Sequence, residues 1–267
     1  MITRRDFCYS FGAALFLLNR NTTAQEKSVF LAKTYQNASG ATMPYRLFVP
    51  ANYDKRKKYP LMLWLHGGAG RGRDNLKQIS SGNRIGSHVW TLPENQSKHP
   101  CFVVAPQCPA NELWATLAMA EPTNQIKLVL ELLRDLQKEF AVDARRLYIA
   151  GQSMGGFGTW SAIAQHPDLF AAAIPVCGGG DESKAANLTA TPIWAFHGEK
   201  DEAVSVERSR KMIDAVKRVG GKPKYTEYKG ADHVIWDKVF GEPELLTWVF
   251  AQKRTTRIQR RTAKRGD

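Results

Sequence analysis

One stretch of this 267-residue chain indicates its fold most clearly: Leu147-Tyr148-Ile149-Ala150-Gly151-Gln152-Ser153-Met154-Gly155. Its first four residues form a short continuous apolar run, which is typical of a strand buried on both faces of a parallel sheet. The last five match the pattern G-x-S-x-G, and a helical stretch follows to about His166. Side chains on either side of Ser153 would collide with the strand and the helix, so glycine is expected there. The stretch predicts a strand, a sharp turn that exposes the Ser153 hydroxyl, and a helix.

The same alternation of strand and helix continues along the chain from about residue 28. An antiparallel pair is expected at 29–35 and 44–49, followed by apolar runs separated by helical periodicity. The pattern predicts one α/β domain with a mainly parallel twisted sheet and helices on both faces. Only 16 residues separate Val176 from Ile193, so we expect no inserted lid domain. The other apolar runs are Leu61–Leu65, Phe102–Ala105, Ala172–Val176 and Ile193–Phe196; the helical stretches are 126–140, 212–219 ending at Gly220, and one opening at Pro243.

Much of the formal charge of +13 lies at the two ends of the chain. Arg4-Arg5, the apolar run 8–18 and the small residues 22–24 resemble a twin-arginine export signal at 1–24. An ordinary N-terminal helix or an uncleaved anchor is the alternative. Residues 25–252 then form the globular domain and 253–267 a basic tail without an apolar face, expected to be disordered. We expect a periplasmic or secreted protein with no stable membrane anchor, and three mature cysteines, Cys101, Cys108 and Cys177, whose pairing the sequence leaves open.

Ser153 needs a base to take its proton and a third group to orient that base. In folds with this kind of turn the order along the chain is serine, acid, histidine. Asp201 follows the strand at 193–196, and His233 follows a last strand near 224–228. Glu199 and Asp232 compete with Asp201 as the acid. His197 competes as the base, and we interpret it as a packed turn residue.

The remaining candidate residues would bind the substrate or stabilise a tetrahedral oxyanion. One donor is expected to be the backbone N–H of Met154, directly after Ser153. The other is expected in the glycine-rich loop after Leu65, with Gly68 as first choice and Gly67 and Ala69 as alternatives; His66 is expected to be structural. The tryptophans Trp90, Trp114 and Trp236 either form an aromatic wall for the substrate or anchor long loops to the core.

These motifs resemble the α/β-hydrolase superfamily over about residues 40–252. The similarity is to compact secreted carboxylesterases, which include feruloyl and acetyl-xylan esterases, polyhydroxybutyrate depolymerase-like proteins and prolyl-oligopeptidase-like predicted peptidases. It rests on His66-Gly67, Pro106-Gln107-Cys108-Pro109, the Ser153 turn, His197-Gly198-x-x-Asp201 and Asp232-His233-x-x-Trp236. Gly70 and Arg73 stand where the peptidase-like relatives often have acidic residues, which leaves the substrate preference open.

The resemblance implies hydrolysis of carboxylic esters, on a bulky or polysaccharide- or polyester-linked substrate. A serine peptidase is the first alternative, although fewer than 40 mature residues precede Leu61, too few for a large gating domain. A catalytically inactive binding protein is the second, but Ser153, Asp201 and His233 are all present. Because the histidines lack metal-ligand spacing and no phosphate-binding loop is present, we expect no metal and no other cofactor. The basic tail lacks aromatic residues and any nucleic-acid-binding motif, so we expect no nucleic-acid partner.

Overall fold

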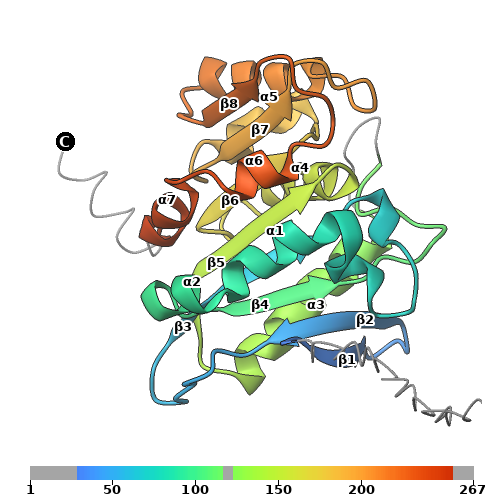
Figure 1. Ribbon diagram of the computed structural model, residues 1–267, viewed down its shortest axis with the longest axis vertical. Helices are drawn as coiled ribbons and strands as arrows, with labels where there is room; N and C mark the ends of the chain where they lie inside the picture. Colours follow the sequence, from blue (N-terminus) through green and yellow to red (C-terminus); the bar gives the residue numbers. More distant parts are fainter. Residues whose placement is uncertain (1–28, 117–122, 255–267) are drawn as a thin grey trace, which may run out of the picture.

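The computed structural model describes residues 29–116 and 123–254 (Figure 1). Within these ranges one 8-stranded sheet has the order β1-β2-β4-β3-β5-β6-β7-β8. β2 pairs antiparallel with β1 and with β4, and all other neighbouring strands are parallel. The predicted mainly parallel α/β sheet is confirmed. The strands are β1 Leu31–Gln36, β2 Thr42–Phe48, β3 Tyr59–Leu65, β4 Phe102–Pro106, β5 Val142–Gln152, β6 Ala172–Val176, β7 Trp194–Gly198 and β8 Lys224–Tyr228.

Helices cover both faces of the sheet (Figure 1). All of β3 is buried, and its alternate side chains enter two separate cores because successive side chains of a strand point to opposite faces. Leu63 packs in the core that contains residues of α3, α4 and α5. Trp64 packs in the other core, with residues of α6 and α7, and against Gly86 of α1. The α-helices are α1 Arg84–His88, α2 Pro93–Lys98, α3 Asn124–Glu139, α4 Met154–Gln165, α5 Glu207–Arg218, α6 Trp236–Phe240 and α7 Leu245–Ala251.

Two elements differ from their predicted bounds. β5 begins at Val142 and not at Leu147, because the strand also includes residues 143–146, which are partly buried or exposed and include no large apolar side chain. The last helix begins at Leu245 and not at Pro243, since the first i→i−4 bond runs from the Trp248 N–H to the Glu244 carbonyl (2.8 Å). Gly220 follows α5 with φ +87°, as expected for the glycine after a helix end. The predicted opening strand pair is present as β1 and β2.

The parallel strands place their carboxyl ends along one edge of the sheet, where ligands of such folds bind. The connection from β6 to β7 contains one 3₁₀ helix, Glu182–Leu188, in place of a lid domain. Within the described ranges, no helix combines the length and apolar character needed to cross a membrane. The export signal predicted at 1–24 lies outside the described residues, as does most of the basic tail.

Candidate active site

Ser153 occupies the sharp turn between β5 and α4, in the backbone conformation φ 54° and ψ −118°. Non-glycine residues rarely adopt such angles, which cost energy and occur mostly at functional sites. A Cβ on Gly151 would lie 2.3 Å from the Gly155 carbonyl oxygen, and a Cβ on Gly155 would lie 2.0 Å from the Leu65 carbonyl oxygen. The predicted need for glycine on both sides of Ser153 is therefore confirmed.

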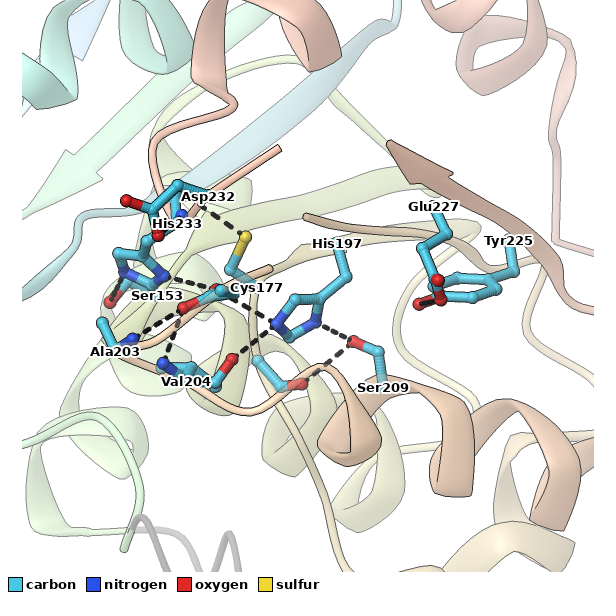
Figure 2. Close-up of polar contacts among 12 residues, drawn as sticks. Ser153, Cys177, His197, Ala203, Val204, Ser209, Tyr225, Glu227, Asp232 and His233 are labelled. Atoms are coloured by element: carbon cyan, nitrogen blue, oxygen red, sulfur yellow. Dashed lines mark hydrogen bonds and ion pairs between the residues drawn. The ribbon is translucent and has the colours of Figure 1, made fainter. Parts of the chain in front are cut away.

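A chain of hydrogen bonds joins Ser153, His233 and Asp201 (Figure 2). The Ser153 Oγ lies 3.0 Å from His233 Nε2, and His233 Nδ1 lies 2.6 Å from Asp201 Oδ2. The Asp201 carboxylate can only accept, so Nδ1 carries a proton and Nε2 of the neutral ring accepts from the serine hydroxyl. The three residues come from the loops after β5, β7 and β8, and the structure brings them together.

Neither competing acid is hydrogen-bonded to the His233 ring. The Glu199 carboxylate accepts a hydrogen bond from the Gly230 N–H (2.6 Å), and the Asp232 carboxylate accepts from the backbone N–H of His233 (2.6 Å). The His233 ring nitrogens are bonded to Asp201 and Ser153 instead. The geometry therefore favours Asp201 as the acid.

The Asp201 side chain is fully buried and has several donors around it. Its Oδ1 accepts from the backbone N–H groups of Ala203 (2.9 Å) and Val204 (2.7 Å), while Oδ2 faces His233. A buried carboxylate must be hydrogen-bonded in this way, because removing it from water without partners costs several kcal/mol. The turn after β7 thus fixes the carboxylate before any substrate is present.

His197 is a residue whose role the sequence interpretation missed. Its Nε2 lies 2.9 Å from the Val204 carbonyl oxygen and 3.1 Å from Asp201 Oδ2, and its Nδ1 lies 2.7 Å from Ser209 Oγ (Figure 2). Burial lowers the pKa of His197, which favours the neutral ring. Both partners of Nε2 are acceptors, so Nε2 carries the proton of the neutral ring. The Ser209 hydroxyl lies beside Nδ1 and also beside the Gly178 carbonyl oxygen (3.1 Å).

His197 is therefore packed, as expected, but it also contacts Asp201 Oδ2, the same oxygen that His233 Nδ1 contacts. The available signal was its position four residues before the acid in the motif His197-Gly198-x-x-Asp201. That spacing does not reveal whether the two side chains meet, because the backbone between them reverses direction.

Cys177 lies beside the same carboxylate and offers the only cluster of metal-ligand side chains found among the described residues. One ligand atom each from Cys177, Asp201 and His233 lie within 4.8 Å of one another. Burial, followed by the charge of Asp201, raises the pKa of the Cys177 thiol far above its usual range, whereas metals bind the thiolate. His233 Nδ1 is also committed to Asp201. The donor set therefore fits a hydrogen-bonded acid better than a metal. Cys101, Cys108 and Cys177 are all buried free thiols.

The expected oxyanion donors, Met154 and Gly68, border the same pocket as Ser153. Met154 is the first residue of α4 and Gly68 the first of the 3₁₀ helix Gly68–Gly70, so neither N–H has a partner within its own helix. The Gly67 N–H donates to Asn83 Oδ1 (2.9 Å), which removes that alternative. Gly68, Met154 and Ser153 line the same pocket. This arrangement favours Gly68 and Met154.

A pocket of about 460 Å³ opens beside Ser153. This volume lies in the range of small-molecule sites. Its lining combines apolar and basic side chains with the backbone of Gly68 in the glycine-rich loop after Leu65. The lining residues are Gly68, Arg71, Leu113, Ser153, Met154, Phe157, Ala203, Val204, Ser205 and Arg208.

The three tryptophans do not line this pocket, which corrects the aromatic-wall hypothesis. Trp90 is 1% exposed and donates to the Gly86 carbonyl (2.8 Å). Trp114 is 0% exposed and donates to the His66 carbonyl (3.1 Å). Trp236 is buried with its ring against His233 (5.3 Å between centroids). Large indoles bury best where the N–H finds a partner, so the alternative of loop anchoring describes Trp90 and Trp114.

Known proteins resemble this chain in sequence and in structure. A model of the prolyl oligopeptidase family matches residues 114–183, which include Ser153. A solved thermostable esterase is 45% identical with a TM-score of 0.81, over 85% of this chain and 64% of that one. A ferulic acid esterase is 18% identical with a TM-score of 0.64, over 82% of this chain and 98% of that one.

Two curated relatives are longer proteins. A bifunctional acetylxylan esterase/xylanase of Neocallimastix patriciarum is 25% identical over 65% of this chain and 24% of its own length. Dipeptidyl-peptidase 5 of Porphyromonas endodontalis is 22% identical over 89% of this chain and 40% of its own length. The chain thus spans less than half the length of these relatives.

The parallel sheet, the sharp serine turn after β5 and the structural likenesses define the fold of the chain, which is that of an α/β-hydrolase domain. Within that class its neighbours include esterases and a dipeptidyl-peptidase.

Proposed function

We propose that this chain is a serine hydrolase that cleaves carboxylic esters through an acyl-enzyme intermediate. The observation that carries the proposal is the continuous hydrogen-bonded chain from Ser153 through His233 to Asp201. It ends at a hydroxyl that borders a pocket of suitable size. Such an arrangement activates a serine that is otherwise a weak nucleophile.

In this mechanism Ser153 Oγ attacks the ester carbonyl carbon while His233 Nε2 takes the hydroxyl proton. The N–H groups of Met154 and Gly68 stabilise the oxyanion, which is a major part of catalysis in acyl transfer. His233 then gives its proton to the leaving alkoxide oxygen, and Ser153 remains acylated. Water activated by His233 releases the acid in the second half. Asp201 keeps Nδ1 protonated and stabilises the imidazolium that forms.

The likeness to a thermostable esterase at 45% identity supports an ester rather than a peptide substrate. An alkoxide also leaves more easily than an amine, so the same residues cleave esters with less assistance. The peptidase alternative is supported by the prolyl oligopeptidase match and by the dipeptidyl-peptidase relative. A panel of 4-nitrophenyl esters, methyl ferulate, acetylated xylan and a proline-containing peptide separates the two, with Ser153→Ala as control. Cleavage of the peptide alone would contradict the esterase proposal.

A bulky or polymer-linked ester is the substrate that we infer. Relatives named for acetylxylan and ferulic acid support this inference, as does a β6–β7 connection that holds only a short 3₁₀ helix. An open groove gains affinity from contacts along an extended ligand. We therefore expect no jump in rate above the micellar concentration of a lipid ester. Interfacial activation would contradict an open groove.

The alternative of an inactive binding protein differs in one measurable property, the reactivity of Ser153. A fluorophosphonate probe should label this residue covalently, and peptide mapping locates the label. Absence of labelling, or a label on another serine, would contradict the proposal.

Export is proposed from the sequence pattern of residues 1–24, and a relative from Arthroderma benhamiae named as a secreted protein supports it. The mature protein should begin at or near Gln25. N-terminal sequencing of the extracytoplasmic form tests this position, and Arg4→Lys with Arg5→Lys should block export. A mature protein that begins at Met1 would contradict the proposed cleavage.

A further inference from the structure

The side chain of Asn83 contacts both the glycine-rich loop after β3 and the residue before Ser153. Asn83 is 2% exposed, and its Oδ1 accepts from the Gly67 N–H (2.9 Å) and lies 3.3 Å from Gln152 Nε2. Gly67 directly precedes the expected oxyanion donor Gly68. Gln152 directly precedes Ser153. One buried amide oxygen therefore joins the two segments that must meet around a tetrahedral intermediate.

The amide group of Asn83 is held in this orientation by further hydrogen bonds. Its Nδ2 donates to the Lys77 carbonyl (3.2 Å), which determines that the oxygen end of the amide faces Gly67. Gln152 Nε2 donates in addition to the Gly82 carbonyl (2.9 Å). The contacts of Oδ1 are therefore in place before a substrate binds.

The direction of the Gly68 N–H depends on the peptide group between Gly67 and Gly68. The carbonyl oxygen of this group accepts from the Gly70 N–H (2.9 Å) and lies 2.7 Å from His66 Nδ1. The N–H and C=O of a trans peptide point in opposite directions. The Gly68 N–H therefore points away from His66 and Gly70.

The preceding peptide group, between His66 and Gly67, is fixed on both sides. Its N–H donates to Asn83, and its carbonyl oxygen accepts from Trp114 Nε1 (3.1 Å). Glycine has more backbone freedom than other residues, so these contacts restrict a residue that could otherwise rotate. Without the Asn83 side chain the buried Gly67 N–H would lose its acceptor, which is costly. The loop would then shift and carry the Gly68 N–H with it.

We propose that Asn83 is a positioning residue that sets the place of the Gly68 N–H relative to Ser153. It acts through Gly67 and Gln152 and does not itself line the pocket. This inference rests on the proposed esterase function and adds a residue that the mechanism above does not use. Loss of one oxyanion donor lowers kcat about 10²- to 10³-fold, so a displaced donor should cost part of that factor.

The test measures inhibition by phenyl trifluoromethyl ketone together with hydrolysis of a 4-nitrophenyl ester. Ser153 Oγ adds to the ketone carbonyl carbon, the serine proton moves to His233 Nε2, and the π electron pair of the carbonyl moves onto its oxygen. The adduct carries an oxyanion like that of the tetrahedral intermediate, so the inhibition constant reports the oxyanion site. Unlike kcat, this constant does not depend on the fraction of the sample that is folded.

Asn83→Ala should raise the inhibition constant about tenfold to 100-fold and lower kcat by a similar factor, at nearly constant KM. Gln152→Met removes the Nε2 donor at nearly the same side-chain length and should raise the inhibition constant about twofold to fivefold. Ser87→Ala is the matched control, because this buried hydroxyl donates to the backbone carbonyl of Asn83 (2.9 Å) and not to its side chain. The control should keep the wild-type inhibition constant.

An unchanged inhibition constant in Asn83→Ala would overturn the inference, whatever happens to kcat, because the oxyanion site would then be intact. An equal rise in Ser87→Ala would also overturn it, since any loosening of this segment would then be sufficient. If Asn83→Ala does not fold, Gln152→Met decides, and an unchanged constant for that variant overturns the inference. A wild-type protein that does not hydrolyse the ester would instead contradict the esterase proposal itself.

Discussion

The two ends of the Ser153–His233–Asp201 chain differ in their surroundings. At the acid end the Asp201 side chain is 0% exposed and is surrounded by backbone donors, His197 and Cys177. At the nucleophile end Ser153 is partly exposed and borders the pocket. Orientation requires fixed partners, whereas a substrate requires access. The surroundings of Asp201 therefore favour the positioning of His233, and those of Ser153 favour the binding of a substrate.

The largest loss of activity is expected at Ser153 and at His233, which joins Ser153 to Asp201. Ser153→Ala removes the nucleophile, and His233→Ala removes the base. Each should lower kcat about 10⁴- to 10⁶-fold, because such residues act as a unit. Steady-state kinetics on a 4-nitrophenyl ester measures the loss, and an unchanged circular dichroism spectrum controls for folding. Near wild-type activity in the serine variant would end the proposal.

Asp201→Asn tests the acid end alone. The amide can donate to His233 Nδ1, which would favour the wrong tautomer, so we expect kcat to fall about 10⁴-fold. KM should change little, since the Asp201 side chain is buried and does not line the pocket. A large rise in KM with little change in kcat would show that the two ends are not separated in function.

Variants of His197 test the acid end separately, because His197 contacts Asp201 and not Ser153. His197→Phe removes the Nε2–H donor, and a misplaced acid should lower kcat about tenfold to 100-fold at nearly constant KM. His197→Gln can return an N–H to the same carboxylate and should recover part of the rate.

Ser209→Ala is the matched variant, since it removes the partner of His197 Nδ1 and the contact of that hydroxyl with the Gly178 carbonyl but leaves His197 Nε2 beside Asp201. We expect its effect on kcat to be smaller than that of His197→Phe. If the phenylalanine variant loses thermal stability but keeps kcat, the role of His197 is structural and not positioning.

The smallest expected effect is on the free energy of unfolding and concerns the nucleophile end. There His66 contacts the glycine-rich loop that contains Gly67 and Gly68. This ring is buried; its Nδ1 contacts the Gly67 carbonyl (2.7 Å) and its Nε2 accepts from the Cys108 N–H (3.0 Å). Burial lowers the pKa of His66 to about 4, below the 6.5 of an unfolded chain. The unfolded state therefore takes up the proton first as the pH falls.

This uptake should reduce the free energy of unfolding between pH 6.5 and about pH 4, by up to about 1.4 kcal/mol per pH unit. His197 should contribute in the same direction, because burial lowers its pKa too. Urea unfolding at several pH values measures the slope. His66→Gln should be less stable at pH 7 but should show a shallower slope, and an equal slope would contradict the role of His66.

Local pattern predicted much of the fold and of the candidate site. The apolar runs at Leu61–Leu65 and Ala172–Val176 predicted buried strands, because unalternating apolar segments fit only a sheet covered on both faces. The glycines around Ser153 predicted the turn from sterics alone. Chain order then placed Asp201 and His233 among the few candidates for the acid and the base, and the structure brings these two within hydrogen-bond distance of each other.

Other features depend on contacts between distant segments, which no local pattern contains. Residues 143–146 of β5 have no partners in the register with β3, and the strand continues through them because Val142 pairs with Tyr59 before them and Leu147 pairs with Leu61 after them. The tryptophans could equally have faced solvent or core, and only packing placed Trp90 and Trp114 inside. The choice of Gly68 over Gly67 depended on Asn83, which binds the Gly67 N–H from 16 residues away.

Short-range sterics, hydrophobic periodicity and strand order were enough to predict the α/β class, the serine turn and a short set of candidates for the acid and the base, in which Asp201 competed with Glu199 and Asp232. Only the tertiary structure decided that His197 faces Asp201, and that Arg71 and Arg208 line one pocket. His197 faces Asp201 because the turn after β7 folds back on that strand, whereas Arg71 and Arg208 follow different strands, β3 and β7. The packing of the whole sheet sets the distance between the ends of β3 and β7 and therefore which of the side chains that follow them can meet.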